Sequence, residues 1–211
     1  MREKLIPILL LFGTFSLIYN PFTKFPFTFL LIIIVILIVT YVQEGTLKGL
    51  HFKTIKSRDF GIILISYALL ELSMDFLFQP LVNRIFNEPA DYSSFKIIEG
   101  KPYQYIKWLL NMWISAAIGE ELFFRSFAFL QLRKIFNNNN IIVVISSSIL
   151  FCLPHLYQGY AGLAMTFLFG LAFGFIYLKY KNIWVNIIVH GLIDSVFLTL
   201  SYLGLTDFYF L

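Results

Sequence analysis

Gly119-Glu120-Glu121-Leu122-Phe123-Phe124-Arg125 places three charged side chains near the middle of an apolar run from Trp108 to Leu130. On insertion scales each such charge costs ~2.5–3.5 kcal/mol at the centre of a bilayer. A membrane segment retains charges at that cost when they form a site or hold one in place. We therefore expect the rest of the chain to surround this cluster and to shield it from lipid.

The composition of the chain is typical of a membrane protein. Hydrophobic residues account for 59% of its 211 residues and charged residues for 13%, whereas soluble domains contain ~25% charged residues. The net charge is +4, but the basic residues lie in short segments between apolar runs. That pattern is typical of topology signals and argues against a nucleic-acid groove. The single Cys152 excludes an internal disulfide and a multi-cysteine metal site.

Long apolar runs predict an all-α, multi-pass transmembrane helical bundle of about seven spans. A short interfacial helix is expected at Leu81 to Phe86. The seven expected spans are 5–19, 27–42, 60–78, 108–130, 141–157, 162–177 and 183–203.

The loops between these spans predict the orientation of the chain. Basic residues gather in alternate loops, namely at Arg2 and Lys4, Lys48 to Arg58, Arg133-Lys134, and Lys179 and Lys181. Because basic loops stay cytoplasmic, we expect the N-terminus inside and the C-terminus outside. A composition rich in Ile, Lys and Asn is typical of an AT-rich genome, so the expected location is a bacterial plasma membrane.

The two adjacent glutamates are expected to have different roles. Neighbouring side chains on a helix point about 100° apart, so Glu120 and Glu121 cannot face one site equally. Glu121 and Arg125 are four residues apart with the acid first, which favours an ion pair. That pair leaves Glu120 without a local cation. An unpaired carboxylate in an apolar setting suits a general base.

Two further spans carry polar groups at a similar depth in the membrane. His155 follows Pro154, where the helix must deform, and is the candidate partner of Glu120. Asn186, His190 and Asp194 recur every four residues on one helix face. The imidazole of His190 can donate a hydrogen bond to a developing oxyanion. The alternative for each histidine is a structural hydrogen bond between helices.

Two other patterns concern packing. Glu71 and Asp75 share one face of their helix, and we expect that face to turn inward or lie near the membrane surface and to pair with a basic neighbour. Small residues recur every four positions in the sixth span, which predicts close approach to another helix. They are Gly162, Thr166, Gly170 and Gly174.

Three ordered motifs, each on its own apolar span, carry a resemblance to a known family. They are Glu120-Glu121-x-x-x-Arg125, Phe151-x-x-x-His155 and His190-x-x-x-Asp194. From Trp108 to Leu203 the chain resembles the CPBP family, the CAAX-prenyl-protease and bacteriocin-processing-enzyme intramembrane proteins. The resemblance implies a catalytic membrane core of four helices at 104–205, preceded by N-terminal spans and polar links at 1–103.

The resemblance also implies an activity, that of a glutamate-type intramembrane endopeptidase acting on a peptide or peptide precursor. By the family pattern Glu120 and His155 activate the water, and His190 and the last motif residue hold the oxyanion. Supporting roles fall to Glu121, Arg125 and Phe151. Some members have Asn at the last position, where this chain has Asp194. An ionised Asp cannot donate a hydrogen bond, so we expect Asp194 to accept one from His190.

Three alternatives stay open at this point. The first is a zinc-dependent peptidase, because the catalytic candidates are also acceptable zinc ligands, although no H-E-x-x-H motif is present. Those ligands would be Glu120, His155, His190 and Asp194. The second is a non-catalytic membrane scaffold or bacteriocin self-immunity protein. The third is a proton-coupled transporter, which the lack of an inverted repeat disfavours. For the peptidase we expect a peptide or protein substrate and the lipid bilayer as partners, and no cofactor or nucleic acid.

Overall fold

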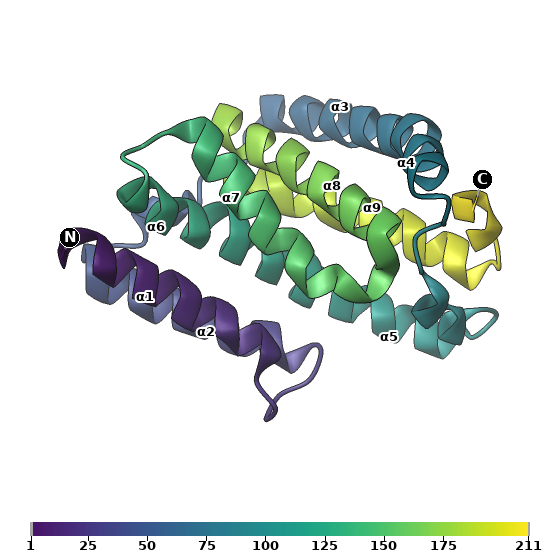
Figure 1. Cartoon of the computed structure of the whole chain (residues 1–211), viewed down its shortest axis with the longest axis horizontal. Helices are drawn as coiled ribbons and strands as arrows, with labels where there is room; N and C mark the ends of the chain where they lie inside the picture. Colours follow the sequence, from purple (N-terminus) through teal and green to yellow (C-terminus); the bar gives the residue numbers. More distant parts are fainter. Residues whose placement is uncertain (1, 211) are drawn as a thin grey trace.

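The structure is a computed structural model that describes residues 2–210, and within that range it contains helices and no strand. The predicted all-α membrane bundle is confirmed. The two ends of the described chain lie at opposite ends of the molecule (Figure 1). In chain order the α-helices are α1 (Arg2–Ser16), α2 (Phe27–Glu44), α3 (Ser57–Ser73), α4 (Gln79–Phe86), α5 (Pro102–Met112), α6 (Ala128–Ile135), α7 (Asn140–Cys152), α8 (Gly159–Tyr180) and α9 (Ile183–Tyr202).

Shorter helical segments join or extend these helices. Two are π-helical, η3 (Met74–Phe78) and η5 (Trp113–Phe127). The 3₁₀ segments are η1 (Leu17–Tyr19), η2 (Lys48–Leu50), η4 (Ser93–Ile98), η6 (Leu153–Gln158) and η7 (Thr206–Phe210).

Fewer stretches than the expected seven qualify as membrane spans by length and composition. Within residues 2–210 four do so: Phe27–Glu44, Ser57–Phe86, Asn140–Tyr180 and Ile183–Tyr202. The first expected span is a shorter apolar helix, Lys4–Tyr19, and about 20 residues are needed to cross a bilayer. The expected fourth span, 108–130, is not among the four, and it carries the three charges of the central cluster. Asn140–Tyr180 contains both α7 and α8, so it includes the fifth and sixth expected spans.

The expected interfacial helix at Leu81 to Phe86 is not a separate element. It forms the end of one helical run from Ser57 to Phe86 that passes through α3, η3 and α4. Pro80 lies inside this run, where it removes one backbone N–H from the helical hydrogen bonding. The π-helical turn η3 directly precedes it, and the helix continues without a break.

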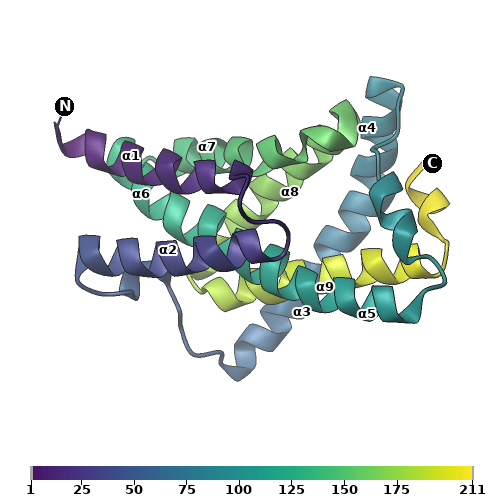
Figure 2. The same cartoon turned by 90° about the horizontal axis from the view of Figure 1, so that it is seen from below.

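A second continuous run, α5–η5–α6, crosses the middle of the molecule, as the teal ribbon shows in Figures 1 and 2. Its π-helical part η5 carries the charged cluster and packs between α2 and α9. On the α9 side the contact depends on Gly191, where a Cβ would lie 2.5 Å from the Trp113 ring. Trp113 also donates from Nε1 to Ser195 Oγ at 3.0 Å. These contacts bring η5 against the α9 turn that contains His190.

The glycine stripe of the sixth span performs the packing role that its spacing predicts. A Cβ on Gly170 would lie 2.9 Å from Cβ of Ser148, and one on Gly174 would lie 2.9 Å from Cγ1 of Val144. The two helices run antiparallel, because the residue number rises on α8 as it falls on α7. The two helices therefore form a close hairpin, and the bend between them holds His155.

The link between α2 and α3 is fastened to the helical core through His51. Its Nδ1 lies 2.7 Å from the Tyr177 hydroxyl on α8, and its carbonyl accepts from the Ile183 N–H at the start of α9. Burial lowers the pKa of the His51 imidazole, and the nearby charges of Lys53, Arg133 and Lys181 lower it further. This residue lies in a polar link outside the long apolar helices.

The lowered pKa of His51 predicts a loss of stability in acid. The unfolded chain binds a proton at this residue at a higher pH than the folded chain does. The contribution of the neutral His51 imidazole to stability is therefore complete above the pKa of the unfolded chain, ~6.5. It is lost as the pH falls below that value. We expect His51→Gln to reduce the drop in thermal midpoint between about pH 7.5 and 5.5. Equal drops in the variant and the wild type, measured in the same detergent, would contradict this assignment.

Candidate active site

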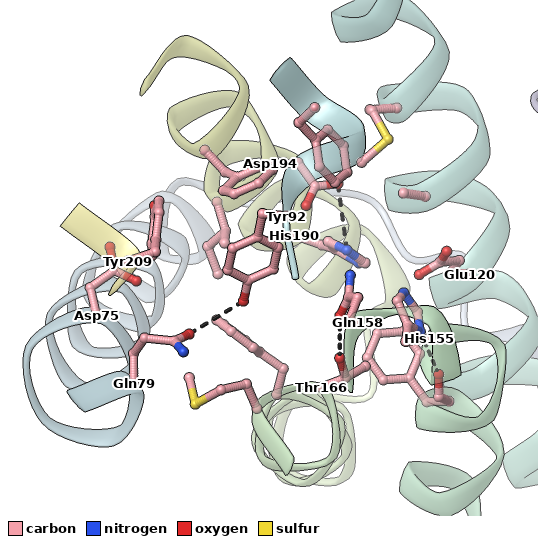
Figure 3. A pocket seen from close by; sticks show the side chains of 18 of the residues that line it. Asp75, Gln79, Tyr92, Glu120, His155, Gln158, Thr166, His190, Asp194 and Tyr209 are labelled. Carbon is pink, nitrogen blue, oxygen red and sulfur yellow. Dashed lines mark hydrogen bonds and ion pairs between the residues drawn. The ribbon is translucent and has the colours of Figure 1, made fainter. Parts of the chain in front are cut away.

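One cavity of about 170 Å³ lies inside the helical bundle. All four catalytic candidates line it, and Figure 3 shows their side chains around it. Glu120 comes from η5, His155 from η6, and His190 and Asp194 from α9. The structure thus brings together the polar groups that the sequence distributes over three apolar segments.

Glu121 binds three polar side chains at the site, and it is 0% exposed. One carboxylate oxygen, Oε1, lies 3.1 Å from Nη1 of Arg125, so the predicted ion pair is present. The same oxygen accepts a hydrogen bond from Nδ1 of His190 at 2.9 Å. The other oxygen, Oε2, accepts from Nδ2 of Asn186 at 3.2 Å. Glu121 therefore joins η5 to α9, which the spacing of the motifs does not predict.

Arg125 is enclosed by aromatic rings as well as paired with Glu121. Its side chain is 1% exposed. The guanidinium carbon Cζ lies 4.0 Å from the ring centroid of Phe151 and 5.2 Å from that of Phe173. A cation over an aromatic face is stabilised by the ring quadrupole, more strongly when water is excluded. Phe151 of the second motif thus supports the site by covering the buried cation.

Glu120 has a different environment from its neighbour. Its carboxylate has no hydrogen bond or ion pair within residues 2–210 and lines the cavity. The π-helical hydrogen bonding of η5 joins residues i and i+5. Within it the Glu121 carboxylate binds α9, whereas Glu120 lies at the cavity (Figure 3). The predicted division between a paired and an unpaired glutamate is therefore what the structure shows.

His155 lies where the α7 helix ends. Its backbone is non-helical, with φ −98° and ψ 15°, directly after Pro154. Nδ1 lies 3.0 Å from the backbone oxygen of Phe151. A carbonyl can only accept, so Nδ1 carries the proton and Nε2 of the neutral ring is an acceptor. His155 can thus accept a hydrogen bond from a group in the cavity.

The contacts of His190 differ from those that the sequence predicts. We expected Asp194 to accept a hydrogen bond from the imidazole, but Glu121 accepts it instead, at Nδ1. The carboxylate of Asp194 lies 3.6 Å from Nε2, close enough for an ion pair but beyond a hydrogen bond. In the described part of the chain, Oδ2 of Asp194 is buried without a hydrogen-bond partner. Both ring nitrogens of His190 therefore face carboxylates.

The opposite part of the cavity wall contains Glu71 and Asp75. Their helix face turns inward as expected, but the expected basic partner is absent: within residues 2–210 neither acid forms an ion pair. The basic residues that lie on helices are not buried at the cavity, with one exception in the described chain. That exception is Arg125, which is buried and already paired with Glu121.

Sequence patterns did not identify several polar residues of the wall. Gln79 accepts a hydrogen bond from the Tyr92 hydroxyl at 3.3 Å, and Gln158 accepts one from Thr166 at 3.2 Å (Figure 3). Tyr209, near the end of the described chain, lines the same cavity. The amides follow no motif, and only Thr166 carried a signal, as a member of the small-residue stripe.

The donor geometry does not match the zinc alternative. Among residues 2–210 no three His, Cys, Asp or Glu side chains are arranged so that they could hold a metal ion together. Glu121 already occupies Nδ1 of His190, and the proton on Nδ1 of His155 points at a backbone carbonyl. The four proposed ligands share a cavity but do not converge on one point.

Residues 102–196 match a family model described as Rce1-like, type II CAAX prenyl endopeptidase Rce1-like. This segment is similar to the Rce1-like family. The recognition made from the three motifs is confirmed, and the matched segment contains every residue of those motifs. A search of curated proteins and a search of solved structures give no match. The division of the chain at 103/104 stays a prediction, as do the individual roles of the residues in the matched segment.

The connections of Glu121 predict a large effect of its substitution on stability. We expect Glu121→Gln to destabilise the folded protein by ~3–5 kcal/mol, because it leaves the guanidinium of Arg125 buried without a counter-charge. The measurement is the thermal midpoint of the purified protein in detergent.

Glu71→Gln is the matched control for this measurement, since it neutralises another glutamate of the cavity region that has no cationic partner in the described chain. We expect it to leave the midpoint unchanged or to raise it. Equal destabilisation by the two variants would show that the Glu121–Arg125 pair has no special importance for folding.

Proposed function

We propose that this protein is an intramembrane endopeptidase that hydrolyses a peptide bond with water activated by Glu120 and His155. One observation carries the proposal: a single cavity is lined by Glu120, His155, His190 and Asp194, which come from three helical segments within the residues that match the Rce1-like model. The family description supports a peptide-bond hydrolase.

In the proposed first step Glu120 acts as the general base. A water molecule between Glu120 and His155 gives one proton to the carboxylate, and its oxygen attacks the carbonyl carbon of the substrate. His155 holds this water by accepting its second O–H at Nε2, since Nδ1 is bound to Phe151. The carbonyl π bond breaks, and the carbonyl oxygen becomes an oxyanion.

His190 is the proposed donor to that oxyanion. With Nδ1 held by Glu121, the ring donates a second hydrogen bond only as an imidazolium, from Nε2. Asp194 faces that nitrogen at 3.6 Å, so its negative charge helps to hold the proton there. A preorganised donor of this kind contributes about 10²–10³ in kcat in other enzymes.

In the second step the tetrahedral intermediate collapses. The C–N bond breaks and the oxyanion electrons re-form the carbonyl. The proton held by Glu120 passes to the leaving nitrogen, so the products are a carboxylic acid and an amine. Glu120 returns to its ionised form without any other reactant.

The proposed substrate is a peptide segment that can reach a cavity inside a membrane bundle. Apolar side chains alternate with the polar ones in its wall, among them Met165, Phe169 and Phe197. A CAAX prenyl endopeptidase acts on a peptide next to a prenylated cysteine; in this proposal the polar groups of the wall face the peptide and its apolar side chains face the lipid. A peptide precursor without a lipid is the second substrate class.

We further propose that the protein lies in a bacterial plasma membrane with its N-terminus inside.

Substitution of Glu120 tests the proposal directly. We expect Glu120→Gln to lower turnover by about 10²–10⁴, the contribution of a positioned general base, without change in the thermal midpoint. The probes are an internally quenched peptide ending in a CAAX sequence, with and without a farnesyl group, and a random peptide library whose products are identified by mass spectrometry.

Glu44→Gln is the control, because Glu44 pairs with Lys134 away from the cavity. It should keep full turnover. Near wild-type turnover in folded Glu120→Gln would refute the role of Glu120, and a folded wild type that cleaves neither peptide nor library would refute the proposed activity.

Metal removal distinguishes this mechanism from the zinc alternative. Because the four candidate ligands do not converge, we expect strong chelators to leave turnover unchanged and elemental analysis of the purified protein to find no stoichiometric zinc. One zinc per chain, lost with activity on chelation and regained with it, would favour metal-assisted hydrolysis instead.

A further inference from the structure

Asn186 makes contacts that its place in the sequence does not explain. It lies on α9, one turn before His190, and is 0% exposed. Its side-chain Nδ2 donates to Oε2 of Glu121 at 3.2 Å and to the backbone oxygen of Phe173 at 2.9 Å. One amide group thus connects three helical elements, α9, η5 and α8, immediately behind the cavity.

The direction of this amide is fixed by its partners. A carboxylate and a backbone carbonyl both accept hydrogen bonds and donate none. Only the NH₂ end of the Asn186 side chain can therefore face them, and a flipped amide would place oxygen against two acceptors. Within residues 2–210 the remaining atom, Oδ1, is buried and has no hydrogen-bond partner. A buried acceptor without a partner destabilises the fold. The two hydrogen bonds that Nδ2 donates therefore outweigh the unpaired Oδ1.

Asn186 and His190 hold the two oxygens of one carboxylate. Nδ2 of Asn186 binds Oε2 of Glu121, and Nδ1 of His190 binds Oε1 at 2.9 Å. Because the two residues are one helical turn apart on α9, they bind Glu121 from the same face of that helix. Rotation of the carboxylate about its terminal bond would break both contacts at once. The position of Oε1, and with it the direction of the His190 ring, therefore depends on the donor at position 186.

We infer that Asn186 is a positioning residue for the reaction: it orients the Glu121 carboxylate, which in turn orients His190 and fixes the proton on its Nδ1. This inference rests on the proposed function. Asn186 does not line the cavity, so it has no contact with substrate. Its effect should accordingly appear in kcat and leave KM unchanged.

Two variants test the inference. Asn186→Leu keeps a similar volume and removes the donor, and Asn186→Asp keeps the shape but places a third acceptor among two others. We expect each to lower kcat on the order of 10²-fold, the effect of a small misplacement of a reacting group. The substrate is the quenched CAAX peptide, or the best library peptide. Should the aspartate variant fail to fold, the leucine variant decides.

A second readout does not require activity. The Nδ1 proton of His190, bound to a buried carboxylate, should exchange slowly with solvent in the wild type, as observed by ¹⁵N-resolved NMR. Single substitutions of His51 and His155 assign the signal among the three histidines. We expect faster exchange in Asn186→Leu. This measurement remains decisive even if the wild type shows no peptidase activity and the proposed function fails.

Gln131→Leu is the matched control. Gln131 is also a fully buried helical amide, but it exchanges hydrogen bonds with Gln43 on α2 and does not line the cavity. It should change neither kcat nor the exchange of the His190 proton. The inference is overturned if Asn186→Leu leaves kcat and proton exchange unchanged, if it alters KM alone, or if kcat falls while the exchange stays slow.

Discussion

A carboxylate that is fully buried within an apolar bundle must have its charge balanced, and Glu121 is that carboxylate. Arg125 supplies the charge from the same helical segment, and His190 and Asn186 supply hydrogen bonds from α9. Removal of any one partner leaves a polar group exposed to a medium that cannot solvate it. The relative placement of η5 and α9, which defines the cavity, is therefore set by the requirements of one side chain.

The aromatic residues around Arg125 stabilise the buried cation of the pair. Within residues 2–210 the guanidinium nitrogens have an ion pair with Glu121 but no hydrogen-bond partner, and the rings of Phe151 and Phe173 cover them from α7 and α8. The same ring of Phe151 lies one turn before His155, whose Nδ1 binds the Phe151 carbonyl. The side chain and the backbone of Phe151 thus connect the buried ion pair to a residue that faces the cavity.

Much of this organisation could be predicted from the sequence, because it depends on local spacing. The i,i+4 relation of Glu121 and Arg125, the glycine stripe of α8 and the helix-ending effect of Pro154 are all properties of neighbouring residues, and the structure contains each of them. The residues that share the cavity followed from three motifs on three apolar runs. Local patterns sufficed for these features because helices place residues at fixed intervals.

The failures of sequence reasoning concern contacts across helices. The partner of His190 was expected on its own helix, at Asp194, but a better acceptor approaches from η5. A basic partner was expected for Glu71 and Asp75, yet the only buried cation of the described cavity region is already paired. The π-helical winding of η5 and the joining of α3 to α4 also depend on tertiary packing, which overrides the ordinary propensities of those residues.

The position of the cation also bears on how the chain enters a membrane. Arg125 lies four residues after Glu121 on one helical segment, whereas His190 and Asn186 arrive more than sixty residues later. During synthesis the two opposite charges can neutralise each other as soon as their own turn of helix forms, before α9 exists. The Glu121–Arg125 pair can thus be delivered to the bilayer as a nearly neutral unit. If the cation lay on a distant helix, Glu121 would remain unpaired in the bilayer until that helix was synthesised.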